Sequence, residues 1–147
     1  VYSQLEGFPK ESEQPDYYKM LANIGEFTNR PETELLVVVG TDNKILGAVV
    51  FIGDMKYYGS GGSATKEQNA SGFRLLAVDP LARGKGIGKI LTIASIHKAR
   101  NRKVGQVIIH TTKAMRAAWK MYENLGFKIS EDVDFMQRDL PVYVFRL

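Results

Sequence analysis

A short glycine-rich turn, set between an apolar run and a long helical pattern, most constrains how this chain can fold. The run Phe73–Val78 has no polar alternation after Arg74, which is typical of a strand buried on both faces. The turn Arg83–Gly88 follows, and a helical pattern extends from Gly86 to about Arg102. The first N–H groups of a helix lack an internal partner, and the helix dipole is positive there. The arrangement therefore predicts a site for a ligand that carries a pyrophosphate.

Composition places the chain among ordinary single-domain proteins. Its 147 residues, 44% of them hydrophobic and 24% charged, predict one domain over residues 1–147 with its own core. The chain has no cysteine, which excludes disulfides and a cysteine nucleophile, and two histidines are too few for most metal sites, so no metal is expected. No apolar run approaches the ~18 residues of a membrane span and no secretory signal is visible, so we expect a cytoplasmic protein that does not bind membranes.

Positive charge is concentrated in and after the turn. The formal net charge is +4, and the stretch from Arg83 to Lys103 carries many lysines and arginines but no acidic residue. Such a stretch suits a polyanion, either nucleic acid or a phosphate-rich cofactor. The alternative for its second half, Lys98–Lys103, is a solvated helix face.

The remaining periodicities predict an α/β chain with a mixed, mostly antiparallel sheet and helices packed on it. A hairpin turn at Gly40–Lys44 makes the two strands that flank it antiparallel neighbours. The expected elements are a helical segment at Glu11–Thr28, strands at Glu34–Val39 and Ile45–Ile52, a loop at Gly59–Gly72, the strand Phe73–Val78, the helix after Gly86, a strand at Val107–Ile109, a helix at Lys113–Asn124, and closing strands at Phe127–Ile129 and Val142–Phe145.

Two common phosphate-binding motifs do not fit the turn. A P-loop requires Ser or Thr after Gly-Lys, whereas Ile90 follows Gly88-Lys89, and Arg83 occupies the position of the first glycine. A dinucleotide-binding fingerprint requires a third glycine that no reading of the turn supplies. A nucleoside triphosphatase and a dehydrogenase are therefore disfavoured.

The pattern that does fit is R-x-x-G-x-G, formed by Arg83, Gly86 and Gly88. With the preceding Leu75–Pro80, it resembles the acetyl-CoA-binding motif of the GNAT N-acetyltransferase superfamily. A second block, Ala118–Phe127, is similar to that family's A-x-x-x-Y-E-x-x-G-F segment. The resemblance covers roughly residues 35–147 and implies a GNAT-like sheet that is splayed at the coenzyme A site. Family members usually open with a strand and a helix that the first ten residues are too short to supply. The expectation is therefore either a truncated chain or one in which those elements are absent or disordered.

The resemblance implies direct transfer of an acetyl group from acetyl-CoA to a primary amine of a small molecule or a protein. Tyr122 matches the tyrosine that acts as general acid on the leaving thiolate; the alternative is a buried tyrosine in an apolar helix stripe. The backbone amide of Leu76 is placed to polarise the thioester carbonyl. The residues implied to bind the cofactor are Leu76, Ala77, Val78, Arg83, Gly84, Lys85, Gly86, Ile87, Gly88 and Lys89.

The sequence leaves the general base and the acceptor open. A lysine-like amine with a pKa of ~10.4 must lose a proton, at a cost near pH 7 of about 4.6 kcal/mol. The candidates for the base are Asp54, Glu67, His110, Glu131, Asp134 and Asp139. The side chains of Tyr57, Tyr58, Phe135 and Met136 are candidates to line an apolar acceptor pocket, with Glu131, Asp132, Asp134 and Asp139 near its rim.

Two other functions stay open beside the enzyme. One is a non-catalytic acyl-CoA-binding or sensing domain on the same fold. The other is a nucleic-acid-binding module, which lacks a recognisable recognition motif, so no nucleic-acid partner is expected. A homodimer is compatible with the resemblance.

Overall fold

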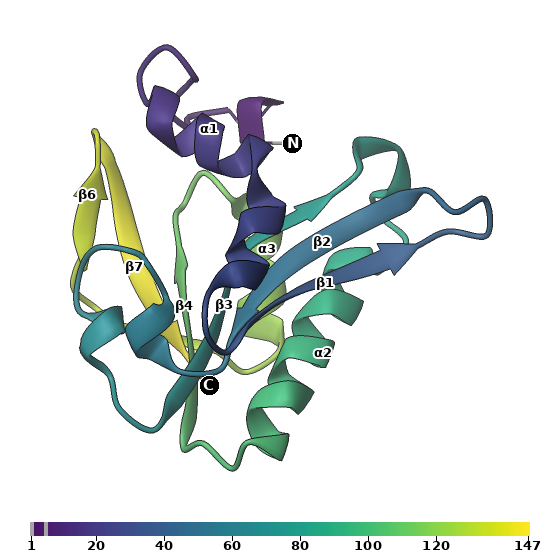
Figure 1. Ribbon diagram of the computed structural model, residues 1–147. Helices are drawn as coiled ribbons and strands as arrows, with labels where there is room; N and C mark the ends of the chain where they lie inside the picture. The colour runs from purple at the N-terminus through teal and green to yellow at the C-terminus, as the bar shows by residue number, and fades with distance from the viewer. Residues whose placement is uncertain (1, 5) are drawn as a thin grey trace.

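A seven-stranded sheet organises the chain in the computed structural model, which describes residues 2–4 and 6–147 (Figure 1). The strands are β1 (Thr33–Val39), β2 (Ile45–Ile52), β3 (Ala70–Val78), β4 (Gln106–Thr111), β5 (Lys128–Ile129), β6 (Phe135–Gln137) and β7 (Leu140–Arg146), and the α-helices are α1 (Pro15–Ala22), α2 (Ile87–Asn101) and α3 (Arg116–Asn124). The strand order is β1-β2-β3-β4-β7-β5, with β6 paired to β7.

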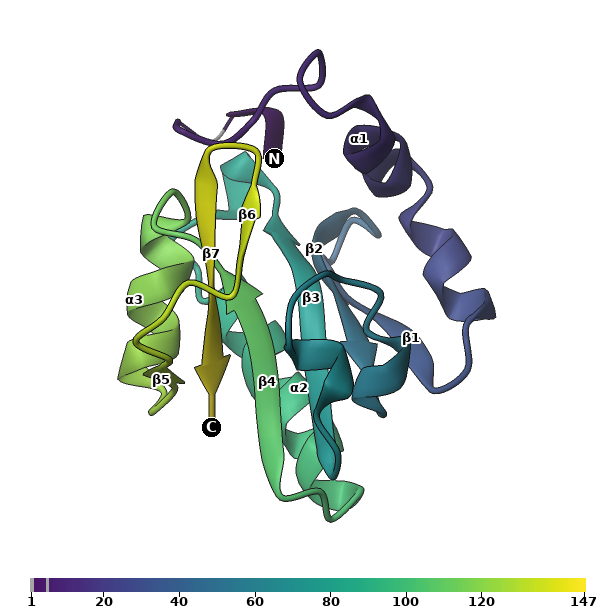
Figure 2. The ribbon, with the colours of Figure 1, turned by 90° about the vertical axis from the view of Figure 1, so that its left-hand side faces the viewer.

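The sheet is mixed and mostly antiparallel, as predicted. Only β3 and β4 pair in parallel, because α2 carries the chain back between them. The other pairs run antiparallel. Figure 2 shows β7, β4, β3, β2 and β1 side by side across the sheet.

Several element boundaries differ from the prediction, and the largest differences lie in short or irregular elements. The helical segment predicted at 11–28 is interrupted at Asn23, where α1 ends and a 3₁₀ helix, Ile24–Asn29, begins. The predicted loop at 59–72 holds a short 3₁₀ helix, Ala64–Lys66, and its last residues belong to β3, which begins at Ala70. The short strand β6 was not predicted. These elements are short or irregular, so their hydrophobic periodicity is too brief to read.

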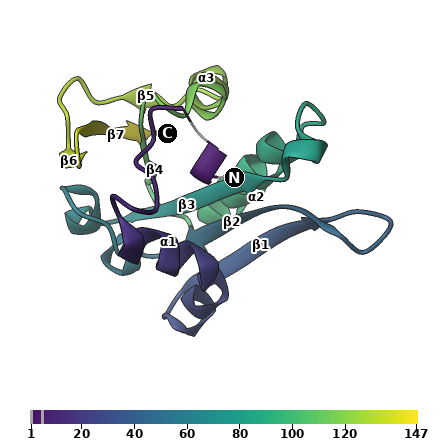
Figure 3. The same ribbon diagram turned by 90° about the horizontal axis from the view of Figure 1, so that it is seen from above.

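Each face of the sheet has its own core. On one face α2 and α3 pack through Leu91 and Tyr122 against Phe73 and Phe145. On the other face the α1 side of the molecule packs through Phe27 on Val50 and Ile108. Figure 3 shows α1 and α2 on opposite sides of the layer formed by β2 and β3.

The sheet opens between β3 and β4. Their pairing covers only the start of β3, from Ala70 to Gly72, so the rest of β3 has no strand partner on its β4 side. At Gly72 the strands are very close, since a Cβ added there would lie 2.5 Å from the carbonyl oxygen of Ile108. Beyond that point the gap leaves space for a ligand, which confirms the predicted splay.

A β-bulge lies where the sheet has opened. The pairing of β2 with β3 shifts register between Ala48 and Val50, and Leu75 on β3 takes a φ of 58°. Bulges re-aim the side chains that follow them. Accordingly, Leu75 packs in the core on the α1 face, whereas Leu76 packs on the α2 face.

Candidate active site

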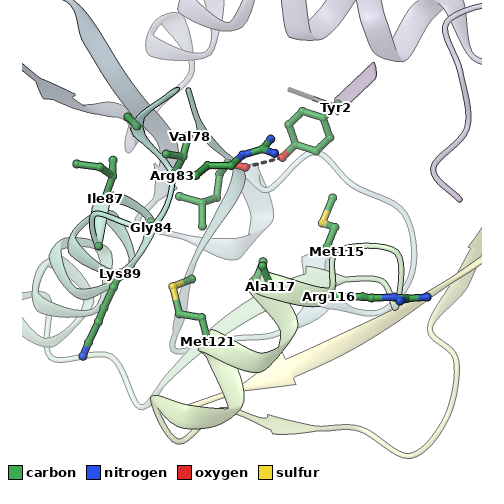
Figure 4. Close-up of a pocket in the computed structure, with 15 residues that line it drawn as sticks. Tyr2, Val78, Arg83, Gly84, Ile87, Lys89, Met115, Arg116, Ala117 and Met121 are labelled. Atoms are coloured by element: carbon green, nitrogen blue, oxygen red, sulfur yellow. Dashed lines mark hydrogen bonds between the residues drawn. The ribbon is translucent and has the colours of Figure 1, made fainter. Parts of the chain in front are cut away.

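A cavity of about 400 Å³ lies between the open end of β3 and the helices α2 and α3. Figure 4 shows Val78 and Ile87 on one wall, with Met115, Ala117 and Met121 opposite. The walls are therefore largely apolar, and a chain of methylene and amide groups suits such a slot. We call this the first cavity.

The glycine turn closes one end of the first cavity. Gly84 and Gly86 have φ values of 75° and 78°, in the left-handed region that glycine tolerates best. The first intrahelical bond of α2 runs from the amide of Ile90 to the carbonyl of Gly86, which leaves the three preceding amides without a helical acceptor. No side chain caps this helix end. These free amides fit the pyrophosphate that the sequence predicts.

Eight of the ten residues predicted to bind the cofactor line the first cavity. They are Leu76, Val78, Arg83, Gly84, Gly86, Ile87, Gly88 and Lys89. Ala77 and Lys85 are outside it. The side chains of Lys89 and Arg116 point away from the cavity in Figure 4. Their positive charges can therefore act on a ligand only through the electrostatic field at the cavity entrance. That these residues bind coenzyme A stays a prediction.

The N-terminal half of α3 and Tyr2 also line this cavity, and neither was predicted. Met115, Ala118 and Met121 belong to the apolar stripe of α3, and a stripe at helical spacing does not by itself distinguish a cavity wall from a core contact. Tyr2 donates a hydrogen bond through its hydroxyl to the carbonyl of Leu76, at 3.1 Å (Figure 4). No pattern in the sequence pairs two residues so far apart.

A second cavity, of about 430 Å³, lies between β3, β4, β7 and the α1 side of the molecule. Tyr2, Leu76, Met115 and Ala118 line both cavities, so the two spaces meet beside the bulge of β3. Tyr58 and Phe135 line the second cavity, as predicted for an acceptor pocket, but Tyr57 and Met136 do not.

Tyr122 lines the second cavity rather than the first. Its ring is buried against Phe73, Phe127 and Phe145, with centroids 5.7–6.2 Å away. Burial raises the pKa of Tyr122 well above its usual 10.0, so the phenol keeps its proton near neutral pH. Among the described residues its hydroxyl has no hydrogen-bond partner. Tyr122 is thus a core residue that also lines the second cavity. Its role as general acid stays a prediction.

One histidine of the second cavity is held between two polar side chains. His110 on β4 contacts Ser60 Oγ through Nδ1, at 3.1 Å, and Asp134 Oδ2 through Nε2, at 2.8 Å. Burial lowers the pKa of His110 below its usual 6.5, although the hydrogen bond and charge of Asp134 act in the opposite direction. Ser60 and His110 line the cavity, and Asp134 lies behind them.

The other predicted bases are outside both cavities. Glu67 pairs with Arg146 at 2.6 Å, and Asp54 accepts a hydrogen bond from the amide of Lys56. Glu131 and Asp139 are exposed. The acid that does line the second cavity, Asp16 of α1, was not predicted.

The basic stretch is partly neutralised. Lys98 of α2 pairs with Glu34 at 2.6 Å, and Arg102, which follows α2, pairs with Glu32 at 2.9 Å. Both of these cations therefore face acids at or near the start of β1. This pairing favours the solvated helix face over a nucleic-acid surface for residues 98–103.

The described residues hold no cluster of metal ligands and no membrane-spanning helix. Nowhere in residues 2–4 and 6–147 do three or more metal-ligating side chains gather closely enough to hold an ion. Across the same residues, no helix combines the length and apolar character that crossing a bilayer requires.

Comparison with known proteins identifies the family. The model of the acetyltransferase (GNAT) family matches residues 2–127. Among curated relatives, the mycothiol acetyltransferase of Nocardioides sp. is 35% identical over 63 residues, which are 43% of this chain and 21% of that protein. That of Thermobifida fusca is 29% identical over 86 residues, 58% of this chain and 26% of that protein. The matched segments thus span about a fifth to a quarter of these relatives.

Solved structures share the fold. A GNAT acetyltransferase of Staphylococcus aureus superposes with a TM-score of 0.64 at 21% identity, covering 90% of this chain and 78% of that one. A GCN5-related N-acetyltransferase of Kribbella flavida gives 0.67 at 17%, covering 100% and 84%. A Bacillus anthracis protein described as a streptothricin acetyltransferase, solved with acetyl coenzyme A, gives 0.64 at 23%, covering 84% and 66%. At these identities the matches show a shared fold. The chain belongs to the GNAT family of acetyltransferases, as its two sequence motifs predict.

Proposed function

We propose that this chain transfers the acetyl group of acetyl-CoA to a primary amine by direct attack of the amine on the thioester. The observation that carries this proposal is the meeting of two cavities beside Leu76. One cavity has an anion-binding helix end, and the other has a histidine kept neutral by burial. Two substrates that enter from opposite sides would bring their reacting atoms together at this junction.

On the donor side, each part of the first cavity matches one part of coenzyme A. The free amides at the start of α2, with the charge of Arg83, suit the pyrophosphate. The unpaired edge of β3 and the methionines of α3 suit the pantetheine arm. We assign the backbone amide of Leu76 to the thioester oxygen, where negative charge develops during attack.

Tyr122 is proposed to protonate the leaving thiolate. A thiol has an ordinary pKa of ~8.5, and burial keeps the Tyr122 phenol protonated throughout the working range. Its hydroxyl is unpartnered among the described residues, so it is available to the sulfur when that atom sits at the junction.

For the acceptor, the second cavity favours a small amine. Its volume of about 430 Å³ lies within the range of small-molecule sites, and Tyr17, Tyr58 and Phe135 supply aromatic walls. The exposed carboxylate of Asp16 is at its edge and suits a cationic group. A protein side chain remains the alternative acceptor. The cytoplasmic location and a homodimer stay predictions.

The test is a panel of primary amines incubated with acetyl-CoA, with release of free thiol as the readout. We expect turnover with at least one small cationic amine and none with acetyl-pantetheine at the same concentration, because the latter lacks the pyrophosphate. Binding of coenzyme A without turnover on any amine would instead establish the acyl-CoA-sensing alternative.

A further inference from the structure

Three polar side chains from separate segments form one hydrogen-bonded chain that ends in the second cavity. Ser60 follows the 3₁₀ helix Met55–Tyr57, His110 belongs to β4, and Asp134 precedes β6. Resting on the acetyl transfer proposed above, we infer that Ser60, His110 and Asp134 form a proton relay that removes the proton from the acceptor ammonium before its nitrogen attacks.

The direction of the relay follows from the chemistry of its members. The Asp134 carboxylate only accepts hydrogen bonds when ionised, so it takes the proton of His110 Nε2. A neutral imidazole has one N–H, which leaves Nδ1 with a bare lone pair. Ser60 therefore donates its hydroxyl proton to Nδ1. The free lone pairs of Ser60 Oγ are then available to an ammonium group in the cavity.

Burial and hydrogen bonding set the protonation states of His110 and Asp134 that this direction of proton transfer requires. It lowers the pKa of His110, so the ring is neutral near pH 7. Burial acts to raise the pKa of Asp134, but hydrogen bonds from Ser63 and His110 outweigh it and hold the pKa below its usual range. An ionised acid therefore stands behind a neutral base, as required of a base and the group that orients it.

The loop that carries Ser60 is anchored to the Asp134 carboxylate by hydrogen bonds. Ser63 donates to this carboxylate from its backbone amide, at 3.0 Å, and from its hydroxyl, at 2.6 Å. A Cβ on Gly62 would overlap the same carboxylate, so the loop can approach it only as glycine. Gly62 also has a φ of 74°. Asp134 thus fixes both the imidazole and the loop from which Ser60 reaches it.

The other groups that face His110 are satisfied elsewhere. Tyr58 accepts a hydrogen bond from the backbone amide of His110, at 3.0 Å. Arg74 of β3 acts to lower the pKa of His110 through its charge, and its guanidinium is held by the carbonyls of Tyr58 and Gly59. The ring of Phe135 packs edge-on against the imidazole, with centroids 5.1 Å apart. The imidazole ring itself lines the cavity, but its Nδ1 contacts Ser60 and its Nε2 contacts Asp134, so a proton from the cavity reaches Nδ1 through the Ser60 hydroxyl.

The proton balance of the step is complete. The ammonium gives one proton to Ser60 Oγ while the original Ser60 proton passes to His110 Nδ1, leaving a neutral amine, an intact hydroxyl and an imidazolium beside the Asp134 carboxylate. After attack on the thioester carbon the C–S bond breaks, and the Tyr122 hydroxyl gives its proton to the leaving thiolate. The second proton of the nitrogen passes to the Tyr122 oxygen and restores the phenol. The proton on His110 returns to solvent.

The test is the pH dependence of kcat/KM for an acceptor found in the amine panel. In the wild type, the relay makes the protonated amine a usable substrate, so kcat/KM should be level from near neutrality up to the pKa of the amine. In His110→Gln only free amine reacts. We expect the kcat/KM of this variant at about pH 7 to be roughly 10²–10⁴-fold lower than that of the wild type. This difference should shrink about tenfold for each pH unit as the pH approaches the pKa of the amine.

Matched variants separate the relay from folding. His97, the other histidine of the chain, is exposed on α2, so His97→Gln is the control and should keep the wild-type profile. In Ser60→Ala, kcat/KM should rise with pH as it does in His110→Gln. Ser60→Thr keeps the hydroxyl, so its kcat/KM should stay level over the same range, as in the wild type. Affinity for coenzyme A, measured by calorimetry, reports folding in each variant. If His110→Gln does not fold, the pair of Ser60 variants carries the test alone.

Each outcome bears on a different claim. Profiles of His110→Gln and Ser60→Ala that run parallel to the wild type, lowered by a constant factor at every pH, would overturn the relay and leave acetyl transfer standing. A wild type that releases no thiol with any amine would overturn the proposed function, and the relay with it. Convergence of the kcat/KM values of the variants and the wild type at high pH supports both the relay and the proposed function.

Discussion

At the scale of single residues, Tyr122 allows a substitution that separates chemistry from packing. Tyr122→Phe removes one hydroxyl that has no partner among the described residues and keeps the ring contacts with Phe73, Phe127 and Phe145. We expect kcat to fall by about 10²-fold, because the thiolate then leaves without a proton donor, and the KM for acetyl-CoA to change little. Initial rates of thiol release at saturating acetyl-CoA measure this.

The matched control is Tyr143→Phe, since Tyr143 of β7 contacts Trp119 of α3 and lies outside both cavities. Its kcat should equal that of the wild type. Equal kcat values for Tyr122→Phe and the wild type would leave Tyr122 with a packing role alone.

The sequence predicted a role for Tyr122 and named His110 and Asp134 among the candidate bases, but it could not predict that these two residues meet Ser60. The reason lies in the spacing of the residues. Tyr122 sits inside a continuous block that resembles a family motif. Ser60, His110 and Asp134 come from three segments separated by whole elements, and they meet only because β4 pairs with β7 beside the loop. A single sequence has no local signal for such a meeting.

At the scale of elements, the start of α2 depends on backbone conformation rather than on side chains. Gly86→Ala introduces a Cβ at a φ of 78°, which costs roughly 1–2 kcal/mol, although no neighbouring atom lies within 4 Å. Relief of this strain would turn the free amides of the helix end away from the pyrophosphate. We expect the dissociation constant of coenzyme A to rise about tenfold, measured by calorimetry.

Gly25→Ala is the control for this substitution, because Gly25 also has open space around it but no positive φ. It should bind coenzyme A as the wild type does. An unchanged affinity in Gly86→Ala would mean that the turn does not hold the ligand.

The opening between β3 and β4 depends on one close contact. Gly72→Ala places a methyl group 2.5 Å from the carbonyl oxygen of Ile108, at the last paired position of the two strands. Separating the strands to relieve this overlap should lower the free energy of unfolding by about 1–3 kcal/mol. Urea denaturation measures the change, and a Gly72→Ala variant as stable as the wild type would show that the parallel pair tolerates separation.

At the scale of the whole molecule, the order of the elements could be predicted but the meeting of the two cavities could not. Hydrophobic periodicity located β1, β2, α2 and α3, because each is long enough to repeat its pattern. The bulge at Leu75 has no sequence signature, since leucine at positive φ is imposed by the surrounding sheet. That bulge turns Leu76 toward the first cavity and so creates the junction.

The relay also links the stability of the whole fold to pH. Because burial lowers the pKa of His110 below its usual 6.5, the unfolded chain binds more protons than the folded one between these two values. The free energy of unfolding should therefore fall as the pH drops through this window, by up to about 1.4 kcal/mol per pH unit from this group. The pKa of Asp134 is also lowered. This group therefore reduces the free energy of unfolding only under more acidic conditions, as the pH falls below the ordinary pKa of 3.8.

The measurement is urea denaturation at a series of pH values from slightly above neutral to mildly acidic. His110→Gln cannot take up the proton, so its free energy of unfolding should fall less than that of the wild type over the same interval. His97→Gln should follow the wild type, because that side chain is exposed on α2 and is not a member of the relay. Equal slopes in the wild type and in His110→Gln would show that the imidazole is as easily protonated in the fold as in water, and the neutral base that the relay requires would be lost.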